Sequence, residues 1–374
     1  MVHLVAGTNA QGYPTALRKA WRDLGLEVAD APAKSSLSEA RGKLSYTFFE
    51  RAFRQQLRGF EERRSTYRGL RIYAIDGDQL ELPLSDDILA SGYRGFPCKH
   101  HQETHFPRLY LVHAYDCVSG VTKDLRYGPE NQELQAAIDM VLSFEAKSVT
   151  LYDRFYLSRK LIAAHAASGS FFLARCKQDW ATFKEVVEFG QSNRRNAAAL
   201  IDGVLVRLVK IVNPRTGKIA VFATNLPRKL FTNLELARLY ARRWEVETSF
   251  RDSTHTAKLE QWHSKSINGI LQELFAHFWL VNAARIQIAL HINPGRGFLE
   301  AMYKRANFKS TLEFLVDCFG KILSGQARQA LADIAAFIRR LIERRTRLRR
   351  AYPRQIKSKR KTYPSACLVQ RRKR

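Results

Sequence analysis

The stretch LYARRWEVETSFRDSTHTAKLEQ, Leu239–Gln261, has the residue spacing of an amphipathic helix with an unusual polar face. An apolar stripe that includes Val246 and Phe250 runs along one side of this helix. A solvent-exposed helix would show the same pattern, so the rest of the chain has to decide whether Glu247 lies on a surface or in a site. At about 100° per residue, the neighbouring side carries a phenol, a carboxylate, a hydroxyl and three cations: Tyr240, Arg243, Glu247, Arg251, Thr254 and Lys258.

An acidic residue stands inside an apolar strand earlier in the chain, in LRIYAIDGDQLELP, Leu70–Pro83. In a strand, Ile72, Ala74 and Asp76 point to the same face. A carboxylate in that position is costly to desolvate unless it binds a cation or is paired with one. Gly77 indicates a close backbone approach or a bulge. Asp76 is therefore a candidate site residue.

A second short apolar strand, SVTLY at Ser148–Tyr152, also ends at an acid, Asp153. The segments around these two strands alternate between strand and helix patterns. Strands are predicted at Arg108–Cys117, Val121–Tyr127 and Ser170–Cys176, and helices at Asn131–Phe144 and Leu157–Ala167. Three strands in succession, followed by helix, strand, helix and strand, predict a mixed sheet with helices on its faces. Asp76 and Asp153 can be neighbours in such a sheet.

Residues 177–226 interrupt this alternation. Their clearest pattern is a hairpin formed by Val204–Ile211 and Lys218–Thr224. We therefore expect a β-rich insertion at 177–226, which divides the mixed-sheet core into residues 67–176 and 227–292.

Helical regions flank this core. Residues 1–66 contain helical patterns at Ala16–Leu24 and Leu37–Phe60, which suit either a helical DNA-binding region or a basic packing domain. Ile267–His291 is a long apolar helix. Residues 293–374 read as a helical C-terminal region, helical to about residue 349, with a basic tail.

The chain carries 62 Lys and Arg against 35 Asp and Glu among 374 residues, a net charge of +27. So large an excess points to a polyanionic partner, with nucleic acid favoured over an anionic membrane. No segment has the apolar length to span a bilayer, and the first residues lack a secretory signal. The five cysteines are scattered, which is typical of a reducing compartment. We expect a cytoplasmic protein, associated with the nucleoid, that makes no membrane contact.

A loop with four potential zinc ligands, Cys98, His100, His101 and His105, precedes the strand at Arg108–Cys117. Structural zinc sites usually use two spaced pairs of ligands, and no second pair of Cys or His stands nearby. A cationic loop close to a phosphate backbone is the better interpretation.

Asp76, Asp153 and Glu247 together offer the oxygen ligands that Mg²⁺ prefers. Two such ions about 3.5–4 Å apart can activate an attacking oxygen and stabilise a leaving one. A mixed sheet and a following helix could bring the three acids together, although a chain of this length contains many Asp and Glu.

The motifs around these acids resemble the three catalytic blocks of bacterial DDE transposases, most closely those of the insertion sequence 4 family. The blocks are AIDGDQLELP around Asp76, LYDRFYLSRKLI around Asp153, and TNLP followed by LYARRWEVETSF around Glu247. The third block is the most specific, because Tyr240, Arg243 and Glu247 keep the family's spacing. The resemblance covers roughly residues 36–290.

This resemblance implies an α/β, RNase H-like fold in which Asp76, Asp153 and Glu247 bind two Mg²⁺ ions, with Mn²⁺ as a substitute. In such enzymes a metal lowers the pKa of the water that attacks the phosphodiester at the transposon end, and the freed 3′-OH then attacks target DNA. The implied partners are DNA, as terminal inverted repeats and as target, and a second copy of the chain in a synaptic homodimer.

The resemblance also implies DNA contacts. Arg243 would hold a phosphate with its forked guanidinium, and Tyr240 would hydrogen-bond a phosphate near the cut. Trp180 is the single Trp of the predicted insertion, and related enzymes stack a flipped base on an aromatic residue there; a core or surface Trp is the plainer interpretation.

The chain departs from the family at Thr254, where the family has a DNA-gripping Lys. Lys258 and Arg251 lie about one turn to either side on the predicted face, and either could reach a phosphate instead. Asp78 is a smaller departure, because the family more often has a small hydroxyl residue there. These differences leave two alternatives to an active transposase: a catalytically weakened or domesticated DNA-binding relative, and a non-transposing RNase H-like nuclease.

Overall fold

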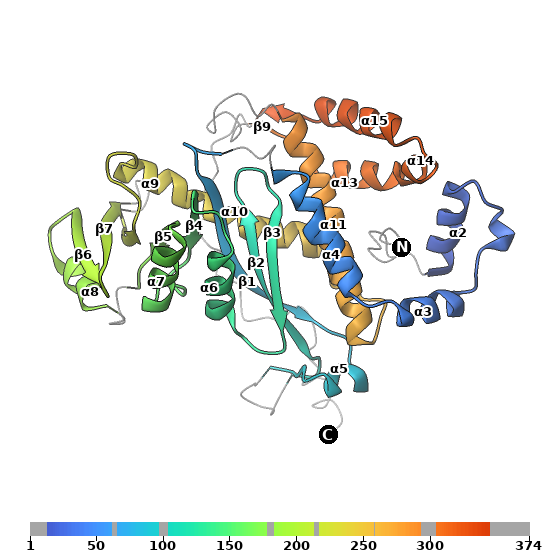
Figure 1. Ribbon diagram of the computed structural model, residues 1–374, viewed down its shortest axis with the longest axis horizontal. Helices are drawn as coiled ribbons and strands as arrows, with labels where there is room; N and C mark the ends of the chain where they lie inside the picture. The colour runs from blue at the N-terminus through green and yellow to red at the C-terminus, as the bar shows by residue number, and fades with distance from the viewer. Residues whose placement is uncertain are drawn as a thin grey trace, which may run out of the picture.

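The computed structural model describes residues 13–61, 66–96, 104–177, 183–212, 217–257, 259–292 and 304–344. An eight-stranded mixed sheet in the order β3-β2-β1-β4-β5-β8-β7-β6 crosses the molecule, with helices on both faces (Figure 1). The strands are β1 Arg71–Glu81, β2 Arg108–Asp116, β3 Thr122–Gly128, β4 Ser148–Tyr152, β5 Phe171–Arg175, β6 Asn196–Ile201, β7 Val204–Val212 and β8 Ile219–Thr224.

The first five strands form the sheet that the sequence predicts. β1, β2 and β3 form an antiparallel meander, and β4 and β5 run parallel to β1. The two parallel connections run through α6, Glu133–Leu142, and α7, Arg159–Ser168. This arrangement confirms the RNase H-like α/β expectation.

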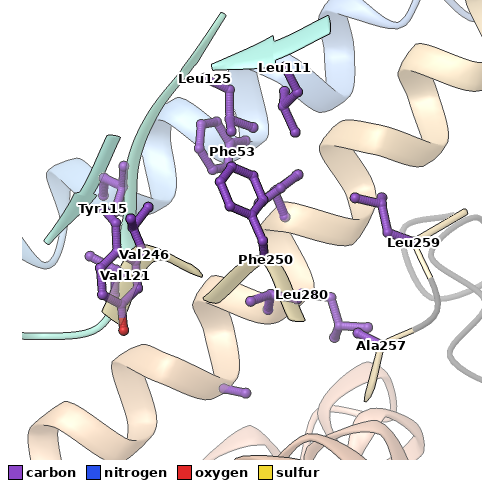
Figure 2. Close-up of a cluster of buried hydrophobic side chains, with 14 of the residues drawn as sticks. Phe53, Leu111, Tyr115, Val121, Leu125, Val246, Phe250, Ala257, Leu259 and Leu280 are labelled. Atoms are coloured by element: carbon purple, nitrogen blue, oxygen red, sulfur yellow. The ribbon is translucent and has the colours of Figure 1, made fainter. Parts of the chain in front are cut away.

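Side-chain alternation along β1 divides the interior into two cores. Tyr73 and Ile75 join the core under α6 and α7, whereas Ile72 and Ala74 join a larger core on the other face. That larger core is covered by α4, Thr47–Arg58, by α10, Trp244–Arg251, and by the 25-residue α11, Ile267–His291. The close-up in Figure 2 shows Phe53, Leu111, Val246, Phe250 and Leu280 meeting there from helices and strands distant in sequence.

The insertion extends this same sheet. β8 pairs antiparallel with β5, and β7 and β6 follow outward, so residues 196–224 continue the core sheet by three strands. The predicted hairpin of β7 and β8 is confirmed. β6 and α8, Lys184–Gln191, were not predicted. Asp202 and Gly203, both at positive φ, form the two-residue turn between β6 and β7, which is the usual role of Asp-Gly in hairpins.

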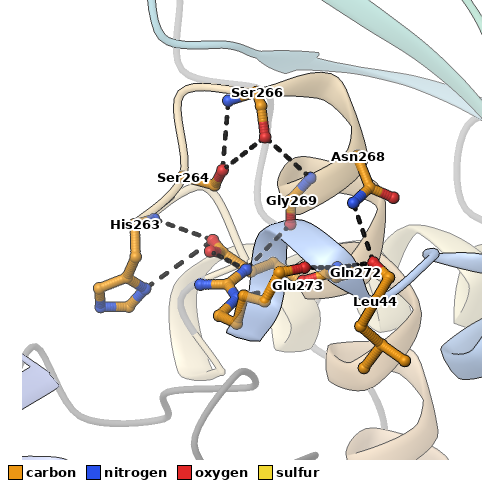
Figure 3. A network of polar contacts seen from close by, with 9 residues as sticks. Leu44, His263, Ser264, Ser266, Asn268, Gly269, Gln272 and Glu273 are labelled. Atoms are coloured by element: carbon orange, nitrogen blue, oxygen red, sulfur yellow. Dashed lines mark hydrogen bonds and ion pairs between the residues drawn. The ribbon is translucent and has the colours of Figure 1, made fainter. Parts of the chain in front are cut away.

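The predicted helix at Leu37–Phe60 is instead two helices, α3, Lys34–Lys43, and α4. The chain turns at Leu44, whose backbone is extended, because side chains of α11 satisfy the polar groups of the break. Asn268 accepts a hydrogen bond from the Tyr46 N–H at 2.9 Å. Its amide donates to the Leu44 carbonyl at 3.0 Å, and Gln272 donates to the same carbonyl (Figure 3).

A buried ion pair links α3 to the same end of α11. Arg41 donates to Glu273 at 2.9 Å, and both side chains are almost fully buried. The second oxygen of Glu273 accepts from the His263 N–H at 2.9 Å, a contact visible in Figure 3. The N-terminal helices are thereby joined to the helix that covers the catalytic core.

Further helical segments lie before, between and after these elements in the chain. They are α2 Tyr13–Asp23, the 3₁₀ turn Val28–Asp30, α5 Asp86–Ala90, α13 Phe308–Asp317, α14 Phe319–Leu323 and α15 Ala327–Arg340. The C-terminal helices pack against α11, and β9 Lys304–Arg305 pairs with β10 Glu343–Arg344. The expectation of helix to about residue 349 is therefore wrong over Leu341–Arg344, and its last residues lie outside the described part of the chain. The basic tail after Arg344 lies outside the described residues.

Candidate active site

Asp76 and Asp153 lie level with each other on neighbouring parallel strands. Ala74 of β1 is in register with Leu151 of β4, so two residues further along each chain come Asp76 and Asp153. The Asp76 side chain points to the same face of β1 as those of Ile72 and Ala74, which lie in the larger core. β4 ends at Tyr152, so no strand of this sheet pairs with β1 on that edge at Asp76.

Glu247 comes to the same face from α10. Val246 and Phe250 of this helix are buried in the larger core, where α10 packs against β1 and β2, and they fix its position. The Glu247 side chain lies beside that buried stripe and is 40% exposed. A fully solvent-exposed helix face is excluded at Arg243, one turn before Glu247, because the Arg243 side chain is only 7% exposed.

Arg243 bridges two of the three acids. Its Nη1 is 3.3 Å from the Asp76 Oδ2, and its Nη2 donates to the Glu247 Oε1 at 2.6 Å. The guanidinium also lies 4.9 Å from the ring centre of Trp244. Among the residues described, the Nε of Arg243 is buried and has no hydrogen-bond partner. One donor of this arginine is thus left for an acceptor that the chain itself does not supply.

The electrostatics of Asp76 reflect a crowded acidic site. Burial raises the pKa of its carboxyl to about 7, from an ordinary value of 3.8. The neighbouring Arg243 lowers this pKa, and the charges of Asp153 and Glu247 raise it again. The fold has therefore brought Asp153 and Glu247 within electrostatic range of Asp76.

These residues suit a divalent cation, because carboxylate oxygens are the donors that Mg²⁺ and Mn²⁺ take and Asp76 lacks full neutralisation. Within the described part of the chain, no three His, Cys, Asp or Glu side chains already converge as a metal-binding group. In this structure the guanidinium of Arg243 supplies positive charge to Asp76 and Glu247.

Tyr240 is half-buried beside Arg243. Its ring meets that of Phe222 edge-on at 4.6 Å, and burial raises the pKa of its phenol to about 12. The phenol therefore keeps its proton and can donate a hydrogen bond. Arg251, the last residue of α10, is exposed.

The third block is less regular than predicted. The helical path begins at Asn233 with α9, Asn233–Tyr240, passes through a 3₁₀ turn at Ala241–Arg243, and ends after α10 in a π-helical stretch, Asp252–Thr256. The single α-helix expected over Leu239–Gln261 is therefore wrong. Because a π turn is wider than an α turn, the 100° face does not continue to Thr254. The Thr254 hydroxyl donates to the Phe250 carbonyl at 2.9 Å.

Several predicted site residues lie outside the described residues: Lys258, Trp180, Cys98, His100 and His101. His105 is described, and its ring packs edge-on against Phe106 at 4.7 Å. Cys117, Cys176 and Cys318 are buried free thiols.

Two acids near the site have roles that the motifs did not predict. The Asp78 carboxylate accepts from the Gln79 N–H at 2.8 Å, and burial raises its pKa. Glu133, the first residue of α6, lies against Gly77. The glycine signalled a close approach in the sequence, but the partner could not be named without the fold.

An RNase H-like sheet with acids on β1, after β4 and on a later helix defines a class of enzymes that act on polynucleotide backbones. The profile of the Transposase DDE domain family matches residues 67–283, more than half of the chain. The chain belongs to this family and is a DDE transposase, an enzyme of DNA transposition. Enzymes of this family bind DNA and use divalent metal ions.

One relative similar in sequence agrees with this assignment. The chain is 22% identical over 355 residues to Transposase InsG for insertion sequence element IS4 of Escherichia coli (strain K12), a match that covers 89% of this chain and 78% of that protein. In fold it is similar to the piggyBac transposase of a cryo-EM synaptic complex with hairpin DNA, with a TM-score of 0.45 and 10% identity. That match covers 72% of this chain and 57% of the piggyBac chain. No helix among the described residues has the length and apolarity to cross a membrane.

Proposed function

We propose that this transposase cuts the ends of its own insertion sequence and joins them to target DNA, with Asp76, Asp153 and Glu247 as its catalytic acids. The observation that carries the proposal is Arg243, which bridges Asp76 and Glu247 beside an Asp153 within electrostatic range. Two carboxylates from elements far apart in sequence share one buried cation, as expected of a site built for positive charge.

The three acids would hold two Mg²⁺ ions, with Mn²⁺ as a substitute. Such ions activate water for attack on a phosphodiester and stabilise the leaving oxygen. Arg243 would bind a phosphate oxygen through its unpartnered Nε, and the protonated phenol of Tyr240 would donate a hydrogen bond to the same strand. These two side chains orient the scissile phosphate over the acids.

Further DNA contacts are proposed for Arg251, exposed at the end of α10, and for Lys258 and Trp180. The proposed domains of the chain are an N-terminal helical DNA-binding region (1–66), an RNase H-like catalytic core (67–176 and 227–292), a β-rich insertion (177–226) and a helical C-terminal region with a basic tail (293–374). The terminal inverted repeats and target DNA are the proposed substrates. A homodimer would hold both ends, and the protein would act in the cytoplasm on nucleoid DNA.

The test is Mg²⁺-dependent cleavage and strand joining of DNA that carries the element's inverted repeats. Asp76→Asn, Asp153→Asn and Glu247→Gln should each abolish cleavage and leave DNA binding within about twofold of the unsubstituted protein. Asp139→Asn, an exposed acid on α6, is the matched control and should cut normally. Normal cutting by Glu247→Gln would refute the assignment.

One observation favours a second candidate, a weakened DNA-binding relative. Thr254 replaces the cation expected by resemblance, and its hydroxyl is bonded to the Phe250 carbonyl within the π stretch. Tight binding of the inverted repeats without any cleavage would support this candidate. Cleavage without strand joining would instead indicate a non-transposing nuclease.

A further inference from the structure

The sequence Asp76-Gly77-Asp78 has a glycine between two acids, and the fold explains why. A Cβ built on Gly77 would lie 2.3 Å from the Glu133 Cδ and 2.4 Å from its Oε1. Both distances are far below van der Waals contact, so the Glu133 carboxyl occupies the space that any other side chain at position 77 would need. Gly77 thus admits an acid from α6 onto the backbone of β1.

Glu133 reaches β1 beside the catalytic acids. The side chains of Asp76 and Asp78 point to one face of β1, and position 77 points to the other. Glu133 therefore approaches β1 from the face opposite to Asp76 and Asp78. β4 ends level with Ile75, and beyond that level no strand of the sheet pairs with this edge of β1. The charge of Glu133 interacts with those of Asp153 and Asp78.

Among the residues described, several other acids in the interior have cationic partners that Glu133 lacks. Glu273 is paired with Arg41, Asp124 with Arg54 and Arg126, and Glu145 with Lys123. In the described part of the chain Glu133 has no Lys or Arg partner. The buried Tyr156 phenol donates a hydrogen bond to the Glu133 Oε2 at 3.3 Å.

A half-buried carboxylate with acidic neighbours and no cation destabilises the metal-free protein. A structural brace for Tyr156 would need only a neutral acceptor such as Gln. The metal-free fold therefore gives no reason for a charged residue at position 133.

We propose that Glu133 is a fourth acidic residue of the divalent-cation site, admitted by Gly77, and that its negative charge raises the affinity of Asp76 and Asp153 for the cation. Glu133 is a positioning residue, since it acts through the acids beside it. The proposal rests on the proposed function, in which those acids hold the metal.

The experiment measures Mn²⁺ binding to the full-length protein without DNA by titration calorimetry, together with thermal denaturation in EDTA. Glu133→Gln keeps the shape of the side chain and an acceptor for Tyr156 but removes the charge. It should weaken Mn²⁺ binding roughly tenfold, the usual effect of losing a residue that supports metal ligands. Asp139→Asn removes the same charge from an exposed site on α6 and should stay within about twofold.

Stability separates this role from a structural one. In EDTA, Glu133→Gln should melt at or above the temperature of the unsubstituted protein, because repulsion between acids is relieved. Gly77→Ala should weaken Mn²⁺ binding by displacing Glu133, and should add little to Glu133→Gln in the double variant.

Unchanged Mn²⁺ affinity in Glu133→Gln, with Asp76→Asn and Asp153→Asn still abolishing binding, would overturn this inference alone. A lowered melting temperature with unchanged Mn²⁺ affinity would make Glu133 a structural brace. Unchanged binding in Asp76→Asn and Asp153→Asn would overturn the proposed site itself.

Discussion

Replacing Arg243 should strengthen the binding of a divalent cation to the protein without DNA. In this structure the guanidinium is the positive charge that Asp76 and Glu247 share, at 3.3 Å and 2.6 Å. A metal ion that takes these oxygens has to displace it. Arg243→Gln removes the competitor and keeps a polar side chain of similar length, so the acids become free for metal.

The size of the effect follows from the two ion pairs. Unit charges about 4 Å apart attract by about 4 kcal/mol at an effective dielectric constant of about 20. Glu247 is 40% exposed, so water weakens its pair, and the desolvation of the buried arginine offsets a further part. A net competition of about 2 kcal/mol remains, which corresponds to about 30-fold tighter cation binding in the variant.

The same exchange couples metal to DNA. Metal binding releases Arg243 for a phosphate, so the two ligands should favour each other through this side chain. We expect Arg243→Gln to change DNA affinity less than about twofold in EDTA and to lower it at least about tenfold in Ca²⁺, which supports binding without the cleavage step.

Calorimetry with Ca²⁺ and fluorescence anisotropy with labelled inverted-repeat DNA measure the two quantities. Arg251→Gln is the matched control, because Arg251 is exposed on the same helix. It should leave Ca²⁺ affinity unchanged and weaken DNA binding equally in EDTA and Ca²⁺. Weaker or unchanged Ca²⁺ binding by Arg243→Gln would refute the idea that this arginine competes with the metal.

Four further predictions concern the acidity of Asp76, stability and DNA contacts. Because the pKa of Asp76 is raised to about 7, a cation has to displace a proton below that pH; Mn²⁺ affinity, measured by titration calorimetry, should rise by up to about tenfold per unit from about pH 5 to pH 7 and then level off, and an affinity that does not change over this range would contradict the prediction. The folded-state pKa also lies above the unfolded value of 3.8, so the folded form binds the extra proton between the two values. The contribution of Asp76 to metal-free stability should therefore decrease as pH rises through that window, as thermal denaturation of the unsubstituted protein and Asp76→Asn can show. Arg41→Ala leaves the buried Glu273 without its ion-pair partner and should cost about 3–5 kcal/mol in the free energy of unfolding; a loss under about 1 kcal/mol in urea denaturation would contradict this. Lys258→Ala should weaken DNA binding and reduce its salt dependence by about one phosphate contact, so an unchanged slope would exclude Lys258 as the replacement for the family's Lys.

Sequence patterns predicted the central sheet because its strands have strong local signals. Ser148–Tyr152 is a run of buried strand residues, and its predicted bounds match β4. Ile267–His291 likewise matches α11, since its apolar residues continue all round the helix. β4 is buried throughout and no residue of α11 is exposed, so the local and tertiary preferences of these segments agree.

The misjudged segments depend on partners far away in the chain. Leu37–Phe60 has helical spacing throughout, yet the helix breaks at Leu44 because Asn268 and Gln272 of α11 bond the freed backbone groups. β6 is only partly buried and rich in Ala, so its alternation is weak; Asp202-Gly203 was the available signal. Glu133 could not have been assigned to Gly77 from spacing, because its approach requires α6 to be packed on β1.

The spacing of the third block follows from the geometry of one side chain. Arg243 and Glu247 are four residues apart, the separation at which an arginine and a carboxylate meet on a helix, and their atoms do meet at 2.6 Å. The other nitrogen of the same guanidinium reaches Asp76, so this arginine ties the helix to β1. A shift of Arg243 by one residue would turn it about 100° away and break both contacts. The block is therefore specific because its arginine has to satisfy two acids from one helical position, and the regular face ends after Arg251, where the helix widens and Thr254 turns its hydroxyl back onto the chain.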